Sequence, residues 1–286
     1  MKTIGQRITE GPLVTSPTLM VSLAALAAMM PAILLPHMAV FRRDLRYWVV
    51  LVLALTMSAL VAADHLSAGW PRGVTPALWL TAATTLAVFL PVAAVTGAAW
   101  RLSVLLLPYV AAIGLLATLV DDPGAALARG GAWTGVHIAV SLVTYGLLTV
   151  AAAAGLAAQL QAHVLKTGGG GRAGRWAALL PAVAESERLE FRLLLASEVV
   201  LALGMASGVA VRLLNGAGIL VFDHKTVLTI AAFAVIGALL LLHARSGTRG
   251  RGAARVVLLA YLLLTLAYPG VKFVSDFFDL MAFMER

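Results

Sequence analysis

Long apolar segments separated by short polar ones constrain this chain more than any other feature of its sequence. A run of about 20 apolar residues is the length that an α-helix needs to cross the hydrocarbon core of a bilayer. Because that core offers no hydrogen-bond partner to a free backbone, such runs fold as helices. The segments lie at about 18–40, 47–63, 76–99, 102–120, 135–157, 193–211, 226–243 and 256–275. The sequence therefore predicts an all-α, polytopic membrane bundle of about eight transmembrane helices, with residues 1–286 forming a single integral membrane domain.

The composition excludes several classes of function. With 61% apolar residues and only 12% charged ones, the chain is far from the composition of a soluble domain. It contains no cysteine, which excludes disulfides, thiolate metal sites and covalent attachment of haem through C-x-x-C-H. No hydrolytic motif rises above chance either, so a hydrolytic enzyme has little support. Any ligand to a metal or haem iron must come from the six histidines or the carboxylates.

The basic residues indicate how the bundle is oriented. Of the 21 Lys and Arg, thirteen lie in the loops after the first, third, fifth and seventh spans, and eight lie on the opposite side. Positive side chains resist translocation, so the richer side is predicted to be cytoplasmic and both termini to lie outside. The basic loops on the predicted cytoplasmic side thus account for the net charge of +8. We expect the lipid bilayer as a partner and no nucleic acid.

Short motifs predict local structure between and within the spans. Only Trp100 and Arg101 separate the third span from the fourth, which favours a tight helical hairpin. The segment KTGGGGRAGRW, residues 166–176, is typical of a flexible loop. Gly204 and Gly208 form a G-x-x-x-G pattern that indicates close packing of two helices.

Two histidines are predicted at the outer ends of spans. His137 opens the fifth span and His224 opens the seventh, so two imidazoles could project into one external pocket and ligate one iron. Asp223 could orient the neighbouring ring through its second nitrogen. The alternative is that each histidine is an ordinary interfacial residue and that Asp223 is a solvated loop acid.

Charges inside the predicted spans are few. Glu198 lies about a turn and a half from the cytoplasmic end of the sixth span, and Lys272 and Asp276 are spaced i,i+4 in the eighth. Buried charges of this kind often mark ion or proton pathways. The simpler alternative is that Glu198 meets a cytoplasmic arginine and that Lys272 pairs with Asp276 at the interface.

The second half of the chain contains six short motifs. The first is HIAVSLVTYGLL, which begins at His137 and includes Tyr145. The others are, in order, ERLEFRLLLASE, LGMASG, FDHKT, LLLLHAR and AYPGVK. Over about residues 133–279 these motifs resemble the cytochrome c assembly family, the CcsA-type and related HemX-like haem-handling membrane proteins. The Trp-rich external segment of that family is degenerate here, because Gly216, Leu220 and Phe222 stand where its tryptophans would align. The family's second external histidine would align near Asp279, so of the paired external ligands only His137 aligns directly.

The resemblance implies a multi-pass protein of the bacterial inner membrane that holds haem b at the outer face during cytochrome c biogenesis. It implies His137 as one axial ligand of the haem iron, and His224 would be a substitute second ligand. Asp223 and Lys225 would orient the ligand or pair a haem propionate. The remaining residues of the site would form its walls and exclude water: Trp133, Tyr145 and Phe222. Attachment of haem to an apocytochrome would need a membrane partner protein of cytochrome c assembly.

Two other functions remain open at this stage. The lost tryptophans favour a non-catalytic membrane subunit or regulator that keeps the fold and binds no haem. The charges at Glu198, Lys272 and Asp276 would suit an ion or small-solute transporter, although the sequence lacks the internal repeat that many transporters carry.

Overall fold

The computed structural model describes residues 17–34, 42–67, 70–71, 73–120, 126–127, 132–168, 171–214, 216, 224–246 and 251–265. This part of the chain is helical apart from one short antiparallel pairing, in which β1 (Trp70–Pro71) pairs with β2 (Ala126–Leu127). The pairing ties the connection before α3 to the connection before α5. The predicted all-α class is thus confirmed for the described residues, with this single two-residue exception.

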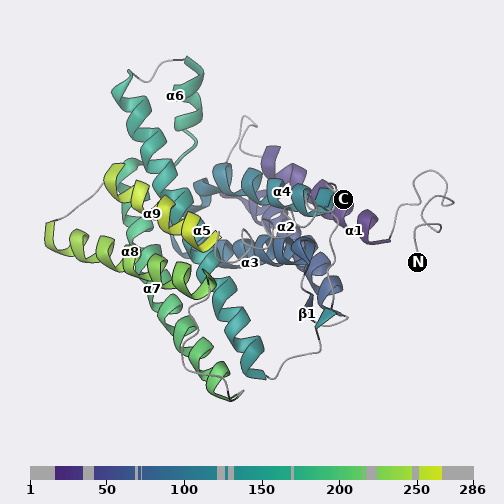
Figure 1. The fold of residues 1–286 in the computed structure, drawn as a ribbon. Helices are drawn as coiled ribbons and strands as arrows, with labels where there is room; N and C mark the ends of the chain where they lie inside the picture. The colour runs from purple at the N-terminus through teal and green to yellow at the C-terminus, as the bar shows by residue number, and fades with distance from the viewer. Residues whose placement is uncertain are drawn as a thin grey trace, which may run out of the picture.

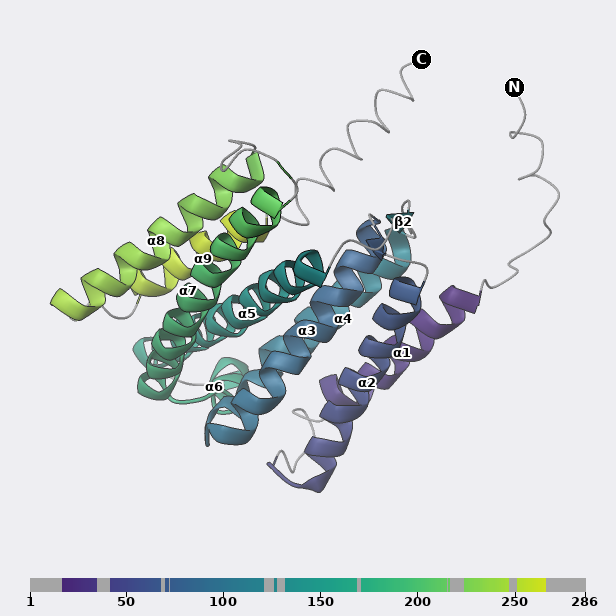
Figure 2. The same ribbon diagram turned by 90° about the horizontal axis from the view of Figure 1, so that it is seen from below.

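The helices form two groups that meet along one helix (Figures 1 and 2). The first group consists of α1 (Pro17–Leu34), α2 (Leu45–Ser67), α3 (Val74–Val95) and α4 (Ser103–Val120). The second consists of α5 (Ala132–Lys166), α7 (Val183–Leu214), α8 (His224–Ser246) and α9 (Arg251–Thr265), with the short α6 (Gly171–Ala177). Helix α5 packs along α7 and α9 within its own group and also against α3 of the first group. It is therefore the central helix of the fold.

Each predicted span coincides with a helix, and six helices of the described residues are long and apolar enough to cross a membrane. They are Leu45–Ser67, Val74–Val95, Ala99–Val120, Trp133–Lys166, Val183–Leu214 and Thr226–Arg245. The first and last predicted spans coincide with the shorter apolar helices Leu19–Leu34 and Arg255–Thr265. The remainder of those two predictions, residues 35–40 and 266–275, lies outside the described residues, as do Lys272, Asp276 and Asp279.

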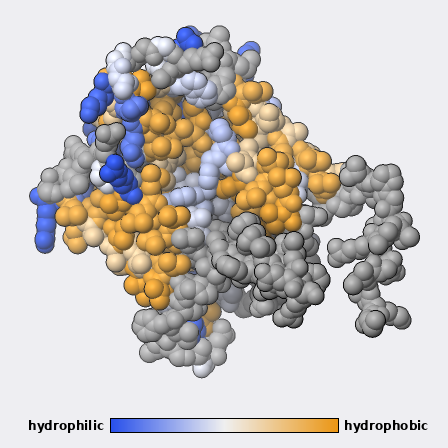
Figure 3. Space-filling view, turned by 45° about the horizontal axis from the view of Figure 1, so that its top comes forward, coloured by the Kyte–Doolittle hydropathy of each residue, from blue (hydrophilic) through white to orange (hydrophobic). Residues whose placement is uncertain are grey.

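The outer surface of the bundle is apolar where a soluble protein would be polar. Figure 3 shows hydrophobic residues over much of the visible face, with hydrophilic ones gathered toward one edge. Large aliphatic side chains point outward on several helices: Leu119 is 73% exposed, Leu241 61% and Leu203 59%. Contiguous exposure of this extent is costly in water and is expected where lipid covers the surface. The structure therefore supports a membrane protein.

Helices α5 and α7 extend well beyond the predicted spans of 135–157 and 193–211. At about 1.5 Å per residue they are roughly 50 Å long, whereas the hydrocarbon core is about 30 Å thick. Their extra turns continue the packing between them, since Ala157, Ala158, Leu189 and Glu190 are all buried. An apolar run marks where a helix lies in lipid, but it does not mark where helix-on-helix packing ends.

The tight hairpin between α3 and α4 is confirmed. Helix α3 ends at Val95, and the 3-10 helix η2 (Ala99–Leu102) leads directly into α4. The carbonyl oxygen of Trp100 accepts hydrogen bonds from the Ser103 hydroxyl at 2.7 Å and from the Tyr47 hydroxyl at 3.3 Å. The second bond joins the hairpin to α2.

The glycine-rich segment differs from its prediction, because residues 171–177 form α6 rather than a flexible loop. Gly168 and Gly171 have positive φ angles of 85° and 71°, which let the chain reverse before α6 begins. The side chain of Gln161 on α5 donates to the carbonyl oxygens of Ala177 and, at 3.2 Å, Leu180. These bonds join α5 to the end of α6 and to the turn that follows it.

We predict that Gln161→Leu releases α6 from α5. Two hydrogen bonds are lost, each contributing about 0.5–1.5 kcal/mol. Limited proteolysis with trypsin should then cut after Arg175 about tenfold faster than in the parent protein. Gln159→Leu, a change of the same kind two residues away, serves as the control. Equal cleavage rates in the two variants would contradict this role of Gln161.

Candidate functional site

The predicted ligand His137 lies in the second turn of α5 and is half-buried against α7. Its Nδ1 atom is 2.9 Å from the hydroxyl oxygen of Ser207, which is on α7. The contact joins two helices through residues that are 70 positions apart in the sequence. The ring orientation is therefore set by tertiary packing.

The hydrogen bonds around Ser207 define which nitrogen of His137 carries the proton. A serine hydroxyl has a single hydrogen. That hydrogen is donated to the carbonyl oxygen of Gly204 at 2.8 Å. With that hydrogen so placed, the hydroxyl oxygen accepts from Nδ1–H of His137, and the neutral ring in this tautomer has its lone pair on Nε2. This is the tautomer that a histidine adopts when it ligates a metal through Nε2 while a second group holds its other nitrogen.

Two glycines allow α5 and α7 to approach closely at this site. A Cβ atom added to Gly208 would lie 3.0 Å from Cε1 of His137, so the imidazole packs directly on the α7 backbone. A Cβ atom at Gly204 would lie 3.4 Å from a methyl group of Val140. The prediction that this G-x-x-x-G pattern is a packing face is confirmed. Its second consequence is that it makes room for the His137 ring.

The other predicted site residues are not all gathered around His137. Trp133 precedes it by one turn on α5 and is 59% exposed. Tyr145 is buried two turns further along α5, where its hydroxyl bonds to α9 rather than to the His137 site. His224 and Lys225 begin α8, but their side chains lie outside the described residues, as do Phe222 and Asp223 entirely.

Tyr145 belongs instead to a cluster of hydroxyl groups from three helices. Its hydroxyl is 2.8 Å from that of Tyr261 and 3.2 Å from that of Thr265, both on α9. The hydroxyl of Tyr109, on α4, bonds to Tyr261 and lies 3.4 Å from that of Tyr145. We call Tyr109, Tyr145, Tyr261 and Thr265 the tyrosine cluster. It ties α9 to both groups of helices.

The donors in the tyrosine cluster can be assigned in one consistent direction. Thr265 donates to the backbone carbonyl oxygen of Tyr261 at 2.8 Å, so its oxygen accepts from Tyr145. Tyr145 in turn accepts from Tyr261, and Tyr261 accepts from Tyr109. Every hydroxyl hydrogen is used inside the protein, as buried polar groups require. The hydroxyl group of Tyr145 is therefore used in the contact between α4, α5 and α9.

The sequence analysis missed two features of α7. Ser207 lies within the G-x-x-x-G pattern of Gly204 and Gly208, and it contacts His137. Glu190 precedes the predicted span of 193–211, yet it is 4% exposed inside the α7 helix. The spacing of Ser186, Glu190, Leu193 and Ser197, in steps of three or four, is the signal that could have placed Glu190 on a buried helix face.

The residues of the site fit one axial ligand of a haem iron. Nε2 of His137 has a free lone pair, and Ser207 holds the ring, which is the arrangement that such a ligand needs. The described residues contain no group of three or more His, Asp or Glu that could hold a free metal ion.

Fold and site together define a polytopic helical membrane protein with an oriented histidine at one end of its central helix pair. The chain belongs to the cytochrome c assembly protein family, which matches residues 13–278. The match thus begins well before Trp133, where the motif resemblance starts. A protein of Azospirillum brasilense, described as an uncharacterized 28.8 kDa protein in the nifR3-like 5' region, is 48% identical over 269 residues. That similarity covers 91% of this chain and 98% of the relative. No solved structure matches the chain.

We predict that Tyr261→Phe destabilises the protein by about 1–3 kcal/mol, because it leaves buried hydroxyls of the tyrosine cluster without a partner. Thermal unfolding in detergent should show a lower Tm. Leu262→Ala is the control, because Leu262 lies on the same helix and its side chain is 51% exposed. A Tm for Tyr261→Phe equal to that of the parent protein would show that the cluster does not stabilise the bundle.

Proposed function

We propose that this protein holds haem b at the outer face of the bacterial inner membrane, as a haem-handling protein of cytochrome c biogenesis. The observation that supports this most directly is the hydrogen-bond chain from His137 through Ser207 to the carbonyl oxygen of Gly204. The contact with Ser207 holds the ring in place, and in the tautomer with the proton on Nδ1 the lone pair of Nε2 is available to a metal. Membership in the cytochrome c assembly family supports the same function.

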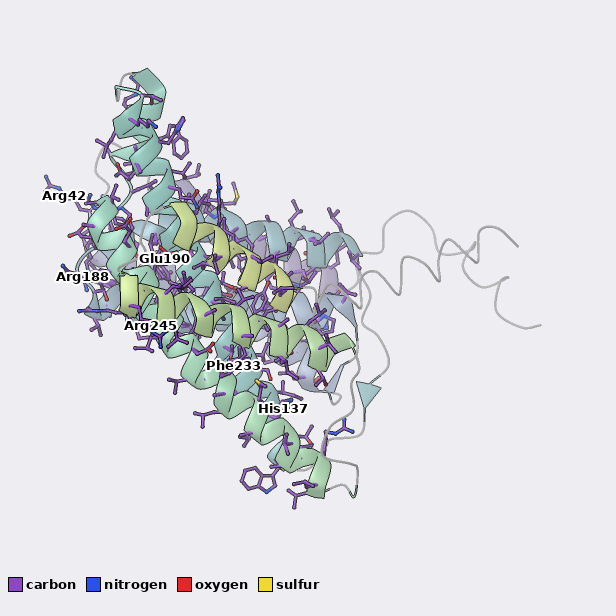
Figure 4. The ribbon with its side chains drawn as sticks, turned by 60° about the vertical axis from the view of Figure 1, so that its left-hand side comes forward. Arg42, His137, Arg188, Glu190, Phe233 and Arg245 are labelled. Atoms are coloured by element: carbon purple, nitrogen blue, oxygen red, sulfur yellow. The ribbon has the colours of Figure 1, made fainter. Side chains whose placement is uncertain are left out.

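The proposed sidedness rests on the distribution of arginines. Arg42, Arg188 and Arg245 gather at one side of the molecule, away from His137 (Figure 4). With the basic loops in the cytoplasm, eight spans place both termini and the His137 end of α5 outside. Haem bound there would lie on the side of the membrane where c-type cytochromes are completed.

In this proposal His137, through Nε2, and His224, at the start of α8, would hold the haem iron. Asp223 and Lys225 orient His224 or pair a propionate. Trp133 and Phe222 wall the site, with Tyr145 deeper along α5. When bound, the haem would supply an iron whose potential is set by its axial ligands. The protein's own task is to orient the imidazole and to limit access of water.

The proposal also requires a partner. Thioether attachment of haem needs cysteine thiols on an apocytochrome, and this chain has no cysteine with which to hold or exchange such thiols. We therefore propose a membrane partner protein of cytochrome c assembly that presents the apocytochrome or continues the transfer.

Absorption spectroscopy of the purified protein tests the proposal. We expect a Soret band, in the oxidised and reduced states, from protein isolated with haem or loaded with it. His137→Ala should remove or strongly weaken the band, because the oriented ligand is lost. His163→Ala is the matched control, since His163 is an exposed histidine at the other end of the same helix.

Two outcomes would contradict this function. One is a purified protein that shows no Soret band even after haem is added. The other is a band that is unchanged when His137→Ala and His224→Ala are combined. A colourless protein that co-purifies with a stoichiometric membrane partner would instead support a subunit that keeps the fold without binding haem.

We further predict that Ser207→Ala weakens haem binding about 10- to 100-fold, because the group that fixes the tautomer and the ring orientation is lost. Titration of the apoprotein with haem measures the effect, and Ser207→Thr should restore binding. Ser197→Ala is a matched control, since Ser197 also donates to a carbonyl oxygen three residues before it on α7. A similar loss in both variants would show that general helix packing, and not the bond to His137, is responsible.

A further inference from the structure

A carboxyl group lies inside the candidate span of α7 with no role in the proposed haem site. Glu198 is half-buried, and its Oε2 atom is buried without a hydrogen-bond partner among the described residues. Sequence reasoning left open whether this side chain reaches a cytoplasmic arginine. In the structure the carboxyl group turns to α8 instead.

Gly237 provides the space for this carboxyl group. A Cβ atom added at Gly237 would lie 3.1 Å from Oε1 of Glu198, so the carboxyl group occupies the notch that the missing side chain leaves on α8. The adjoining turns of α8 are apolar, with Phe233 on one side and Leu240 and Leu241 on the other. The acid therefore lies between two helices in apolar surroundings.

The charged groups of the neighbouring elements are remote from the notch along their helices. On α8 the nearest ionisable side chain is His243, six residues from Gly237, and it stacks on Phe191. On α7 the nearest are Arg192, six residues from Glu198, and Glu190.

The second helix packed on α7 is α5, which carries four ionisable groups. The four ionisable groups are His137, Tyr145, His163 and Lys166. Helix α5 meets the face of α7 that holds Gly204 and Gly208. Tyr145 is committed to the tyrosine cluster and His137 to Ser207. No partner that would favour the ionised carboxylate faces the notch from the described residues.

Of the cations that could neutralise this acid, a proton is the one that a single carboxyl group can hold. A metal ion would need several oxygen ligands around it. The described residues contain no group of three or more His, Asp or Glu that could supply them. An ionised carboxylate left alone in the bilayer is strongly disfavoured.

We propose that Glu198 is a proton-binding site within the membrane and, being half-exposed on the surface that lipid covers, a modification site for hydrophobic carbodiimides. The reaction is balanced without any further reactant. The acid proton moves to one nitrogen of the carbodiimide, the carboxyl oxygen bonds to the central carbon, and one C=N bond becomes single. The product is an O-acylisourea, which rearranges to a stable N-acylurea with no leaving group.

Two of the three further acids on α7 serve as internal controls. Glu190 is 4% exposed, so the protein shields it from lipid. Glu185 is exposed in the first turn of the helix, at the end nearest the basic loops. A hydrophobic reagent that reaches its target through the bilayer, and that reacts with the protonated acid, should distinguish Glu198 from both.

The experiment treats the full-length protein in phospholipid vesicles with dicyclohexylcarbodiimide at neutral pH and locates the adduct by mass spectrometry. We expect one adduct per chain, on Glu198, in at least about tenfold excess over Glu185 and Glu190. Glu198→Gln should abolish it. The same variant should shift Tm by less than about 2 °C, because an amide matches a protonated carboxyl group in shape and charge.

Three results would overturn the proposal: no adduct on Glu198, an adduct suppressed by added Na⁺ or K⁺, or a large fall in Tm for Glu198→Gln. Suppression by Na⁺ or K⁺ would indicate a metal site, and a large fall in Tm an ionised partner. Labelling of the wild-type chain decides the first two points even if the variant fails to fold. No haem is needed, so the result is independent of the proposed haem site.

Discussion

The close approach of α7 to α5 is the contact on which the rest of the structure depends. In a bilayer the hydrophobic effect does not draw helices together, so they associate through small residues that let backbones meet and through polar contacts between them. Gly204 and Gly208 supply the first, and the bond from His137 to Ser207 supplies the second. Helix α5 also packs on α9 and on α3 of the first group, so the helix that makes this contact also joins the two helical groups. The feature that stabilises the bundle is also the one that orients its candidate ligand.

Polar groups inside this bundle fall into two kinds. The tyrosine cluster and the His137–Ser207 pair use their hydrogens within the protein, so each joins helices that are distant in the sequence. Glu198 and Glu190 each have a buried oxygen without a partner among the described residues. Satisfied polar groups in a membrane stabilise one arrangement, whereas unsatisfied ones are costly and are kept where they have a task. Of the two unsatisfied acids, Glu198 is the one to which we assign a task.

The family, the helical class and the positions of the six candidate spans could be predicted because they depend on local properties of the chain. Apolar runs are read residue by residue, and the motifs around His137 and Gly204 retain their order in the sequence. The helix ends were predicted less well, as in α7, where packing on α5 extends the helix past its apolar run to include Glu190. Likewise, the glycine-rich segment contains α6, whose end accepts a hydrogen bond from Gln161 on α5. Local composition contains no information about a partner 16 residues away.

Taken alone, the sequence determined that this chain is a multi-helix membrane protein with few internal charges, and it singled out His137, because length and hydropathy suffice to choose between water and lipid. Only the tertiary structure decided what the polar side chains do. It assigned Tyr145 to a joint between α4, α5 and α9, selected the tautomer of His137 through Ser207, and seated Glu198 against Gly237. The physical reason is that a hydrogen bond or a glycine notch depends on which faces of two helices meet. That register is set by packing over the whole bundle.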